Sequence, residues 1–149
     1  MLIEIKAKVS RIIDGKTRKR TETYLIDKEL YAQAEYAVML SLSQEEAAGS
    51  VSSSEIISLR QSLIKEICEE TMQGSSSSFI ATLKDIFHDD SGNEKSMRYK
   101  VLLWADNLSQ ANQRAQQLSH QGYDMQIEGI KQVDYEYLTE NENEQENNS

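Results

Sequence analysis

The chain has 149 residues, a hydrophobic fraction of 38% and a formal net charge of −9, values that fit one globular domain or two closely joined halves. The sequence predicts neither a signal peptide nor a membrane span, so we expect the protein to stay in the cytoplasm. Its single cysteine, Cys68, excludes an internal disulfide and is predicted to be a buried apolar residue rather than a nucleophile.

The first part of the chain predicts two strands, a hairpin turn and a helix. Apolar and polar residues alternate from Ile3 to Val9, as in a strand with one buried face. Asp14-Gly15 favours a tight turn, after which the run from Thr17 to Ile26 is predicted to return antiparallel. Asp27 is the expected N-cap of a helix that begins near Lys28. The apolar face of this helix is predicted to consist of Tyr31, Ala34, Val38 and Leu42.

The same order recurs from residue 79. Residues 79–88 alternate in polarity, residues 89–93 favour a looser turn, and residues 97–104 are predicted to form the returning strand. A second helix is expected after Asp106-Asn107 and should end near Gly122. In this helix Leu108-Ser109-Gln110-Ala111 matches Tyr31-Ala32-Gln33-Ala34 at a distance of 77 positions, which indicates an internal duplication.

Residues 55–68 admit two interpretations. Ile56, Leu59, Leu63 and Ile67 recur at helical spacing, which favours a helix. The duplication favours a strand, because residues 63–67 resemble residues 129–133, which should close the second unit. We therefore predict a closing strand in each half. The Ser-rich stretches 49–54 and 74–78 are predicted to be loops.

Together these elements predict an α+β protein of two tandem β-β-α-β units, with antiparallel sheets and with the helices packed on one face. The first unit is expected over residues 1–72 and the second over residues 79–138, with a Ser-rich linker at 73–78. Residues 139–149 are all polar and cannot offset the cost of ordering their backbone, so we expect a disordered acidic tail.

This order of elements resembles that of an uncharacterised family. The resemblance rests on a Gly-containing hairpin, on the strand end Tyr24-Leu25-Ile26-Asp27 before an Ala-rich helix, and on the strand Ile64-Lys65-Glu66-Ile67. The family is known as domain of unknown function 4494 and occurs in gut Bacteroidetes and their phages. The resemblance covers roughly residues 3–138. It implies the fold and no activity, and a phage-encoded member would act in the host cytoplasm.

The distribution of charge implies a partner. Residues 1–28 carry eight basic and four acidic residues, whereas residues 134–149 carry six acidic residues and no basic one. A basic hairpin suits a phosphate backbone, and the aromatic residues Tyr24, Tyr99 and Trp104 could stack on unpaired bases. The competing interpretation is a solvated sheet edge with these aromatic residues in the core. The predicted nucleic-acid-binding residues are Lys6, Lys8, Arg11, Lys16, Arg18, Lys19, Arg20, Arg98, Lys100 and Trp104.

The sequence carries no catalytic motif. His88-Asp89-Asp90 are consecutive in a turn and His120 is predicted at a helix end, so neither indicates a metal or catalytic site. The pairs Glu45-Glu46 and Glu69-Glu70 lack an apolar pocket and should be solvated. We therefore expect no enzyme activity, no cofactor and no metal.

Two function hypotheses follow. The leading one is a non-enzymatic single-strand-binding or replication accessory protein, whose acidic tail contacts partner proteins. The alternative is a protein-interaction or inhibitor module that uses its sheet edges or its acidic surface against a host or partner protein, as the overall negative charge favours. Neither hypothesis involves a membrane, and both leave homo-oligomerisation open.

Overall fold

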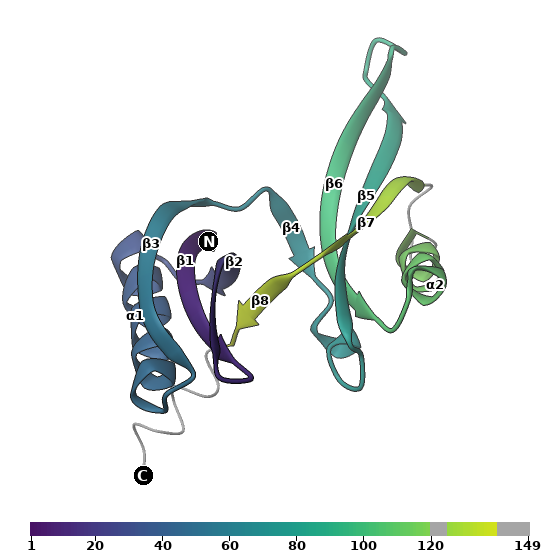
Figure 1. Cartoon of the computed structure of the whole chain (residues 1–149). Coiled ribbons are helices and arrows are strands. Elements are labelled where there is room, and N and C mark those ends of the chain that lie inside the picture. The colour runs from purple at the N-terminus through teal and green to yellow at the C-terminus, as the bar shows by residue number, and fades with distance from the viewer. Residues whose placement is uncertain (120–124, 140–149) are drawn as a thin grey trace. The chain divides into compact units, whose positions relative to one another are not determined.

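The computed structural model describes residues 1–119 and 125–139, and the chain divides into two compact units. Unit 1 consists of Met1–Ser62 and the segment from Tyr135 onward, and unit 2 consists of Leu63–Asp134. In the described residues each unit has a four-stranded sheet and one α-helix (Figure 1), which confirms the predicted α+β class. No helix in these ranges is long and apolar enough to cross a membrane.

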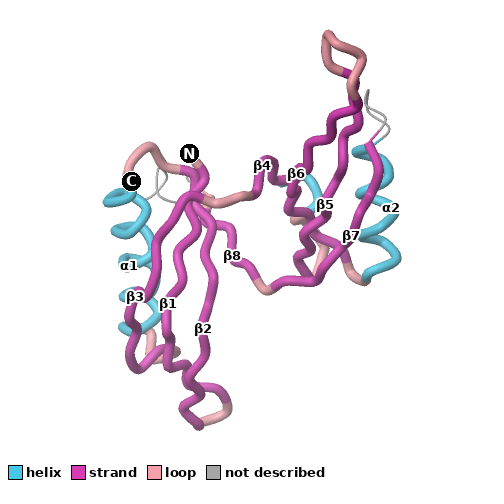
Figure 2. The backbone as a smooth tube through the Cα atoms, turned by 90° about the horizontal axis from the view of Figure 1, so that it is seen from above, coloured by secondary structure: helices cyan, strands magenta, loops and turns pink. Residues whose placement is uncertain are grey.

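In unit 1 the strands lie in the order β3-β1-β2-β8, and α1 runs along one face of the sheet (Figure 2). β1 pairs antiparallel with both β2 and β3, whereas β8 is parallel to β2. The elements are β1 (Leu2–Ile13), β2 (Lys16–Asp27), α1 (Tyr31–Ala47), β3 (Val51–Gln61) and β8 (Tyr135–Leu138).

Unit 2 repeats this arrangement with the strand order β4-β6-β5-β7 and helix α2. β5 pairs antiparallel with β6 and β7, and β4 is parallel to β6. Its elements are β4 (Ile64–Ile67), the 3-10 turn η1 (Glu69–Thr71), β5 (Ser77–His88), β6 (Glu94–Ala105), α2 (Leu108–Ser119) and β7 (Met125–Val133).

The apolar residues that the sequence pattern places on the inner faces do form the cores. In unit 1 the alternating residues from Ile3 to Val9 are buried against α1, together with Ala34, Val38 and Leu42. The remaining residue of the predicted helix face, Tyr31, is exposed at the start of α1. The predicted tight turn is confirmed, because Asp14 and Gly15 both have positive φ angles, 52° and 75°.

The internal duplication is visible in how each helix begins. α1 and α2 start at Tyr31 and Leu108, 77 positions apart, and their first buried residues are Ala34 and Ala111. The glutamine before each alanine reaches back to the strand–helix junction: Leu30 N–H donates to Gln33 Oε1 at 3.3 Å, and Asp106 N–H donates to Gln110 Oε1 at 2.8 Å. The repeated Gln-Ala pair therefore has the same structural role in both units.

The buried alanines permit close contact between helix and sheet, so Ala34→Leu and Ala111→Leu are each expected to destabilise the protein by about 1–3 kcal/mol through overpacking. Ala32→Leu is a matched control, because Ala32 is exposed on α1. Urea denaturation measures the three variants. Equal midpoints for Ala34→Leu and Ala32→Leu would contradict close packing at this contact.

The fourth strand of each sheet corrects the predicted unit boundaries. β4 follows β3 in sequence but pairs with β6 of unit 2, and β8 follows β7 but pairs with β2 of unit 1. The contact-defined boundary therefore lies at Ser62/Leu63 rather than after residue 72, and the chain returns to unit 1 at Tyr135. The sheets are also mixed rather than purely antiparallel, because both of these short edge strands pair in parallel.

Residues 55–61 and 64–67 are strand, so the strand interpretation is confirmed and the helical spacing was misleading. The internal match was misaligned, however. The strand that closes the first unit is β3, so residues 63–67 correspond to β8 and not to residues 129–133. The Ser-rich stretches are also partly strand, since β3 begins at Val51 and β5 at Ser77.

The predicted N-cap at Asp27 is wrong. Asp27 is the last residue of β2 and accepts a hydrogen bond from the N-terminal ammonium group at 2.9 Å, while α1 begins at Tyr31 with Leu30 as its N-cap. The N-terminal charge competes for the carboxylate, and no sequence rule for helix starts includes that contact. The predicted helix end at Gly122, His120 and the tail from residue 140 lie outside the described residues.

Candidate nucleic-acid interface

The register of β1 and β2 divides the predicted basic stripe between two faces of the hairpin. Arg11, Lys16, Arg18 and Arg20 share the face of the buried residues of β1, which is the face toward α1. Lys6, Lys8 and Lys19 lie on the opposite face, which we call the open face of unit 1. The prediction placed Lys6, Lys8, Lys16, Arg18 and Arg20 in one stripe, with Lys19 and Arg11 at its edge or tip, and the register shows that it is wrong. Side chains alternate along a strand, so the pairing of the strands decides which cations are neighbours.

On the face toward α1, Glu22 engages two of the predicted cations. Arg11 donates to both carboxylate oxygens of Glu22, and its Nη1 lies 2.9 Å from Glu45 Oε2 on α1. Arg20 Nε lies 2.6 Å from Glu22 Oε2, and the Tyr24 hydroxyl donates to Glu22 Oε1 at 2.5 Å. The side chains of Arg11 and Glu22 are only 16% and 11% exposed. We call these residues the Glu22 cluster; it links the hairpin to α1.

The electrostatics of the Glu22 cluster mark it as structural. Burial by itself would raise the pKa of Glu22, but hydrogen bonds from Arg11, Tyr24 and Arg20 outweigh it and lower the pKa to about 2. The hydrogen bond to Glu22 raises the pKa of Arg11, and burial with the adjacent carboxylate raises the pKa of Tyr24. Arg11 and Arg20 are therefore internal partners, and buried Tyr24 offers no face for base stacking.

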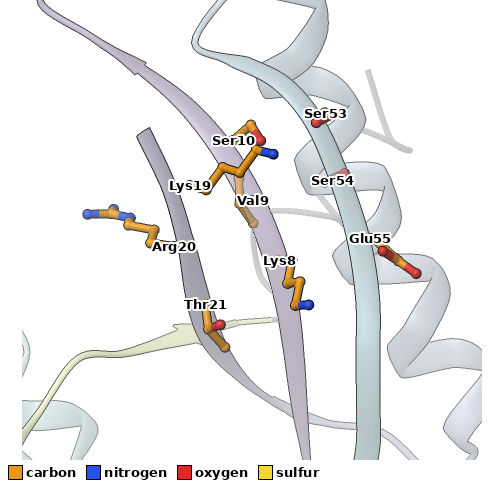
Figure 3. A pocket seen from close by; sticks show the side chains of 9 residues that line it. All are labelled: Lys8, Val9, Ser10, Lys19, Arg20, Thr21, Ser53, Ser54 and Glu55. Carbon is orange, nitrogen blue, oxygen red and sulfur yellow. The ribbon is translucent and has the colours of Figure 1, made fainter. Parts of the chain in front are cut away.

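A hollow of about 530 Å³ lies over the distal part of the β1–β2 hairpin and β3 (Figure 3). Lys19 and Ser10 point toward each other from neighbouring strands, whereas Arg20 points away. Lys8 and Lys19 are exposed, and neither forms an ion pair with another described residue. The lining residues are Lys8, Val9, Ser10, Lys19, Arg20, Thr21, Ser53, Ser54 and Glu55.

The predicted cations of unit 2 lie on a separate sheet. Arg98 Nε is 2.7 Å from Glu128 Oε2, and Lys84 Nζ is 4.0 Å from Glu128 Oε1. The hydrogen bond from Arg98 lowers the pKa of Glu128, and the same contact raises the pKa of Arg98. Arg98 therefore has an internal partner, whereas Lys100 is exposed and pairs across the strands with Thr82.

The aromatic residues of unit 2 that were proposed to stack on bases are buried or half-buried. Trp104 is only 8% exposed; its backbone N–H donates to Thr71 Oγ1 at 2.9 Å and its carbonyl accepts a hydrogen bond from Arg114. Tyr99 is half-buried, and Lys65 Nζ lies 4.5 Å from the centroid of its ring. Trp104 is buried, so the core interpretation is the correct one for it.

The structure also reveals carboxylates that the sequence reading missed. Glu22 and Glu128 each organise two cations, and Glu45, predicted to be solvated, binds Arg11. A signal for Glu22 was available, because it alternates with Tyr24 and Ile26 on the buried face of β2. A carboxylate on an apolar face needs a partner, and the pairing of β1 with β2 supplies Arg11.

The remaining candidates for chemistry are structural. Asp89 Oδ1 accepts hydrogen bonds from the backbone N–H groups of Ser91 and Asn93 at 3.0 and 2.8 Å, so it organises the turn. Cys68 is buried as predicted, and burial together with nearby Glu70 and Glu66 raises its pKa to about 12. Among the described residues no group of three or more potential ligands could hold a metal ion.

Comparison with known proteins identifies a family only. No curated protein and no solved structure matches the chain significantly. A family model described as a domain of unknown function, DUF4494, matches residues 2–145, which include every element of both units. The order of strands and helices in the sequence already resembled this family. The chain therefore belongs to the DUF4494 family.

Proposed function

We propose that the protein is a non-enzymatic nucleic-acid-associated protein, either single-strand-binding or a replication accessory factor, that uses the hairpin of unit 1. The supporting observation is that Lys8, Lys16, Arg18 and Lys19 are exposed around this hairpin and form no ion pair with another described residue. Cations without internal partners remain available to pair with the phosphates of a nucleic-acid backbone. We call these four residues the hairpin cations.

The net charge of −9 does not oppose this proposal, because the charges are segregated along the chain. At physiological salt the Debye length is about 8 Å, so a polyanion at the hairpin responds mainly to the charges close to it. In the proposal the acidic C-terminal segment contacts partner proteins, and the protein acts in the cytoplasm, that of the host if a phage encodes it.

A salt series with a fluorescent oligo(dT) strand tests the proposal. Affinity should fall as salt rises, and changing the four hairpin cations to Ala should weaken binding at low salt by about tenfold or more. The slope of log affinity against log salt should become shallower by about 0.7 for each phosphate contact that is lost. Anisotropy measures both quantities.

The matched comparison sets Lys16→Ala/Arg18→Ala against Lys95→Ala/Lys131→Ala, which removes the same charge from exposed positions of unit 2. This control should change the slope much less than the hairpin variant. The proposal fails if the chain ending at Thr139, which lacks the acidic residues beyond that point, shows no oligonucleotide binding at low salt.

A second candidate function is a protein-interaction or inhibitor module. The favouring observation is that α1 exposes large apolar side chains away from its sheet, with Tyr36 67% and Met39 51% exposed. Exposed aromatic and Met side chains are typical of the centre of protein interfaces. A pull-down that returns one stoichiometric protein, survives nuclease and is lost in Tyr36→Ser/Met39→Ser would favour this function over the first.

A further inference from the structure

The two sheets contain a β-bulge at the same place, and the residue in the bulge differs. In unit 1 the pairing of β1 with β3 shifts between Lys6 and Ala7, which leaves Ile57 in the bulge. In unit 2 the pairing of β5 with β7 shifts between Thr82 and Leu83, which leaves Glu128 in the bulge. Ile57 and Glu128 therefore occupy equivalent positions in the duplicated fold.

The residue in the bulge determines whether the neighbouring cations have a carboxylate beside them. In unit 2, Glu128 lies 2.7 Å from Arg98 and 4.0 Å from Lys84, so its charge is shared by two basic side chains. Lys8 of unit 1 lies on β1 where Lys84 lies on β5, one residue beyond the bulge pair in each unit. Ile57, 43% exposed, supplies no charge there. The bulge position thus supplies a carboxylate to Lys84 in unit 2 and none to Lys8 in unit 1.

From this difference and from the hollow beside Lys8, we propose that the open face of unit 1 has a phosphodiester-binding site for single-stranded nucleic acid. The site deepens the proposed function and rests on it. Lys8 and Lys19 provide the positive charge, and Ser10, Thr21 and Ser53 provide hydroxyl donors around the same hollow (Figure 3). The hydroxyls complement a group that carries several acceptor oxygens.

Glu55 reduces the positive charge at the hollow. Glu55 lines the hollow and pairs with Lys8 in the register of β1 and β3, and the two side chains form no ion pair. Two further carboxylates on this face have partners: Glu4 pairs with Arg60, and Asp27 pairs with the N-terminal ammonium group. Lys8, Lys19 and Glu55 together carry a formal charge of +1, which a single phosphodiester neutralises. The backbone of a polynucleotide therefore matches the charge of the hollow.

The test transfers the carboxylate of unit 2 to unit 1. In the full-length chain, Ile57→Glu should pair with Lys8 and weaken oligo(dT) binding by about tenfold, whereas Ile57→Gln, of the same size but neutral, should bind within about twofold of the parent. Urea midpoints of the two variants should agree, because Ile57 is exposed. NMR amide shifts on adding oligo(dT) should map to Ser10, Thr21 and Ser53.

Each outcome separates the site from the function. Weak binding by Ile57→Glu alone, with shifts at the hollow, supports the site. Equal binding by Ile57→Glu, Ile57→Gln and the parent, together with a loss in Lys16→Ala/Arg18→Ala, overturns the site and leaves the proposed function standing. Inorganic phosphate that shifts the same amides at a lower concentration than oligo(dT) overturns the choice of a phosphodiester. No oligonucleotide binding at low salt, either by the parent or by the chain ending at Thr139, overturns the site and the function together.

Discussion

A chain that ends at Asp134 is expected to lose about 2–4 kcal/mol of the stability of unit 1, whereas a chain that ends at Thr139 keeps it. The first truncation removes β8 and the second keeps it. Because small domains have a total stability of only about 5–15 kcal/mol, this loss is a large fraction of what holds unit 1 together.

The physical reason is that β8 covers an otherwise open edge of β2. It pairs in parallel with Thr23–Ile26, a segment in which Tyr24, Leu25 and Ile26 are almost completely buried. Leu138 also packs against the core of unit 1. Removing β8 exposes this apolar surface and leaves backbone groups without partners, while the cost of ordering four residues is recovered and offsets part of the loss.

Hydrogen exchange and urea denaturation measure the effect. Amides of β2 should exchange faster in the chain ending at Asp134, while amides of β5 and β6 in unit 2 should keep their protection, because their pairing does not involve β8. Identical urea midpoints for the two truncated chains would show that the fourth strand is dispensable to unit 1.

Glu22→Gln is expected to destabilise the protein by about 2–3 kcal/mol at pH 7, because it leaves the largely buried Arg11 with a neutral partner in place of a carboxylate. The folded-state pKa of Glu22 is about 2, below the ordinary value of 4.5. The folded chain therefore binds fewer protons than the unfolded chain over this range. The stabilisation is complete above pH 4.5 and is lost as the pH falls toward 2.

Denaturation across this pH range checks the assignment. The parent should lose about 2 kcal/mol more stability between these pH values than Glu22→Gln does, after allowance for the part of the cluster that contacts solvent. Glu128→Gln is the matched control in unit 2, where the partner Arg98 is 62% exposed, and should lower the stability much less than Glu22→Gln does. Equal losses in the two variants would remove the distinction between a structural carboxylate and a surface ion pair.

The duplicated halves share a framework and differ in how their cations are used. Both place a hairpin against a helix with a buried alanine in its first turn, and both have a bulge at the same point of the sheet. In unit 2 the cations beside the bulge are held by Glu128, while the hairpin of unit 1 keeps exposed cations on two faces. A binding role confined to one half is consistent with this difference.

The sequence by itself determined the local elements and their order. Alternation from Ile3 to Val9, the Asp14-Gly15 turn and the 77-residue repeat all express short-range physics: side-chain period, turn conformations that need positive φ, and helix spacing. These rules act within a few residues, so the pattern was enough to predict the α+β class and two β-β-α units.

Only the tertiary structure decided which distant segments meet. The partners of β4 and β8 lie in the sheet of the other half of the sequence, and parallel pairing between short strands leaves no local signal in either one. The tertiary structure also decided which basic residues have an internal partner and which are exposed. The strand register places Arg11 beside Glu22 and places Lys8 in an open hollow. Pairing across strands determines which charges become neighbours, and spacing along a single strand does not.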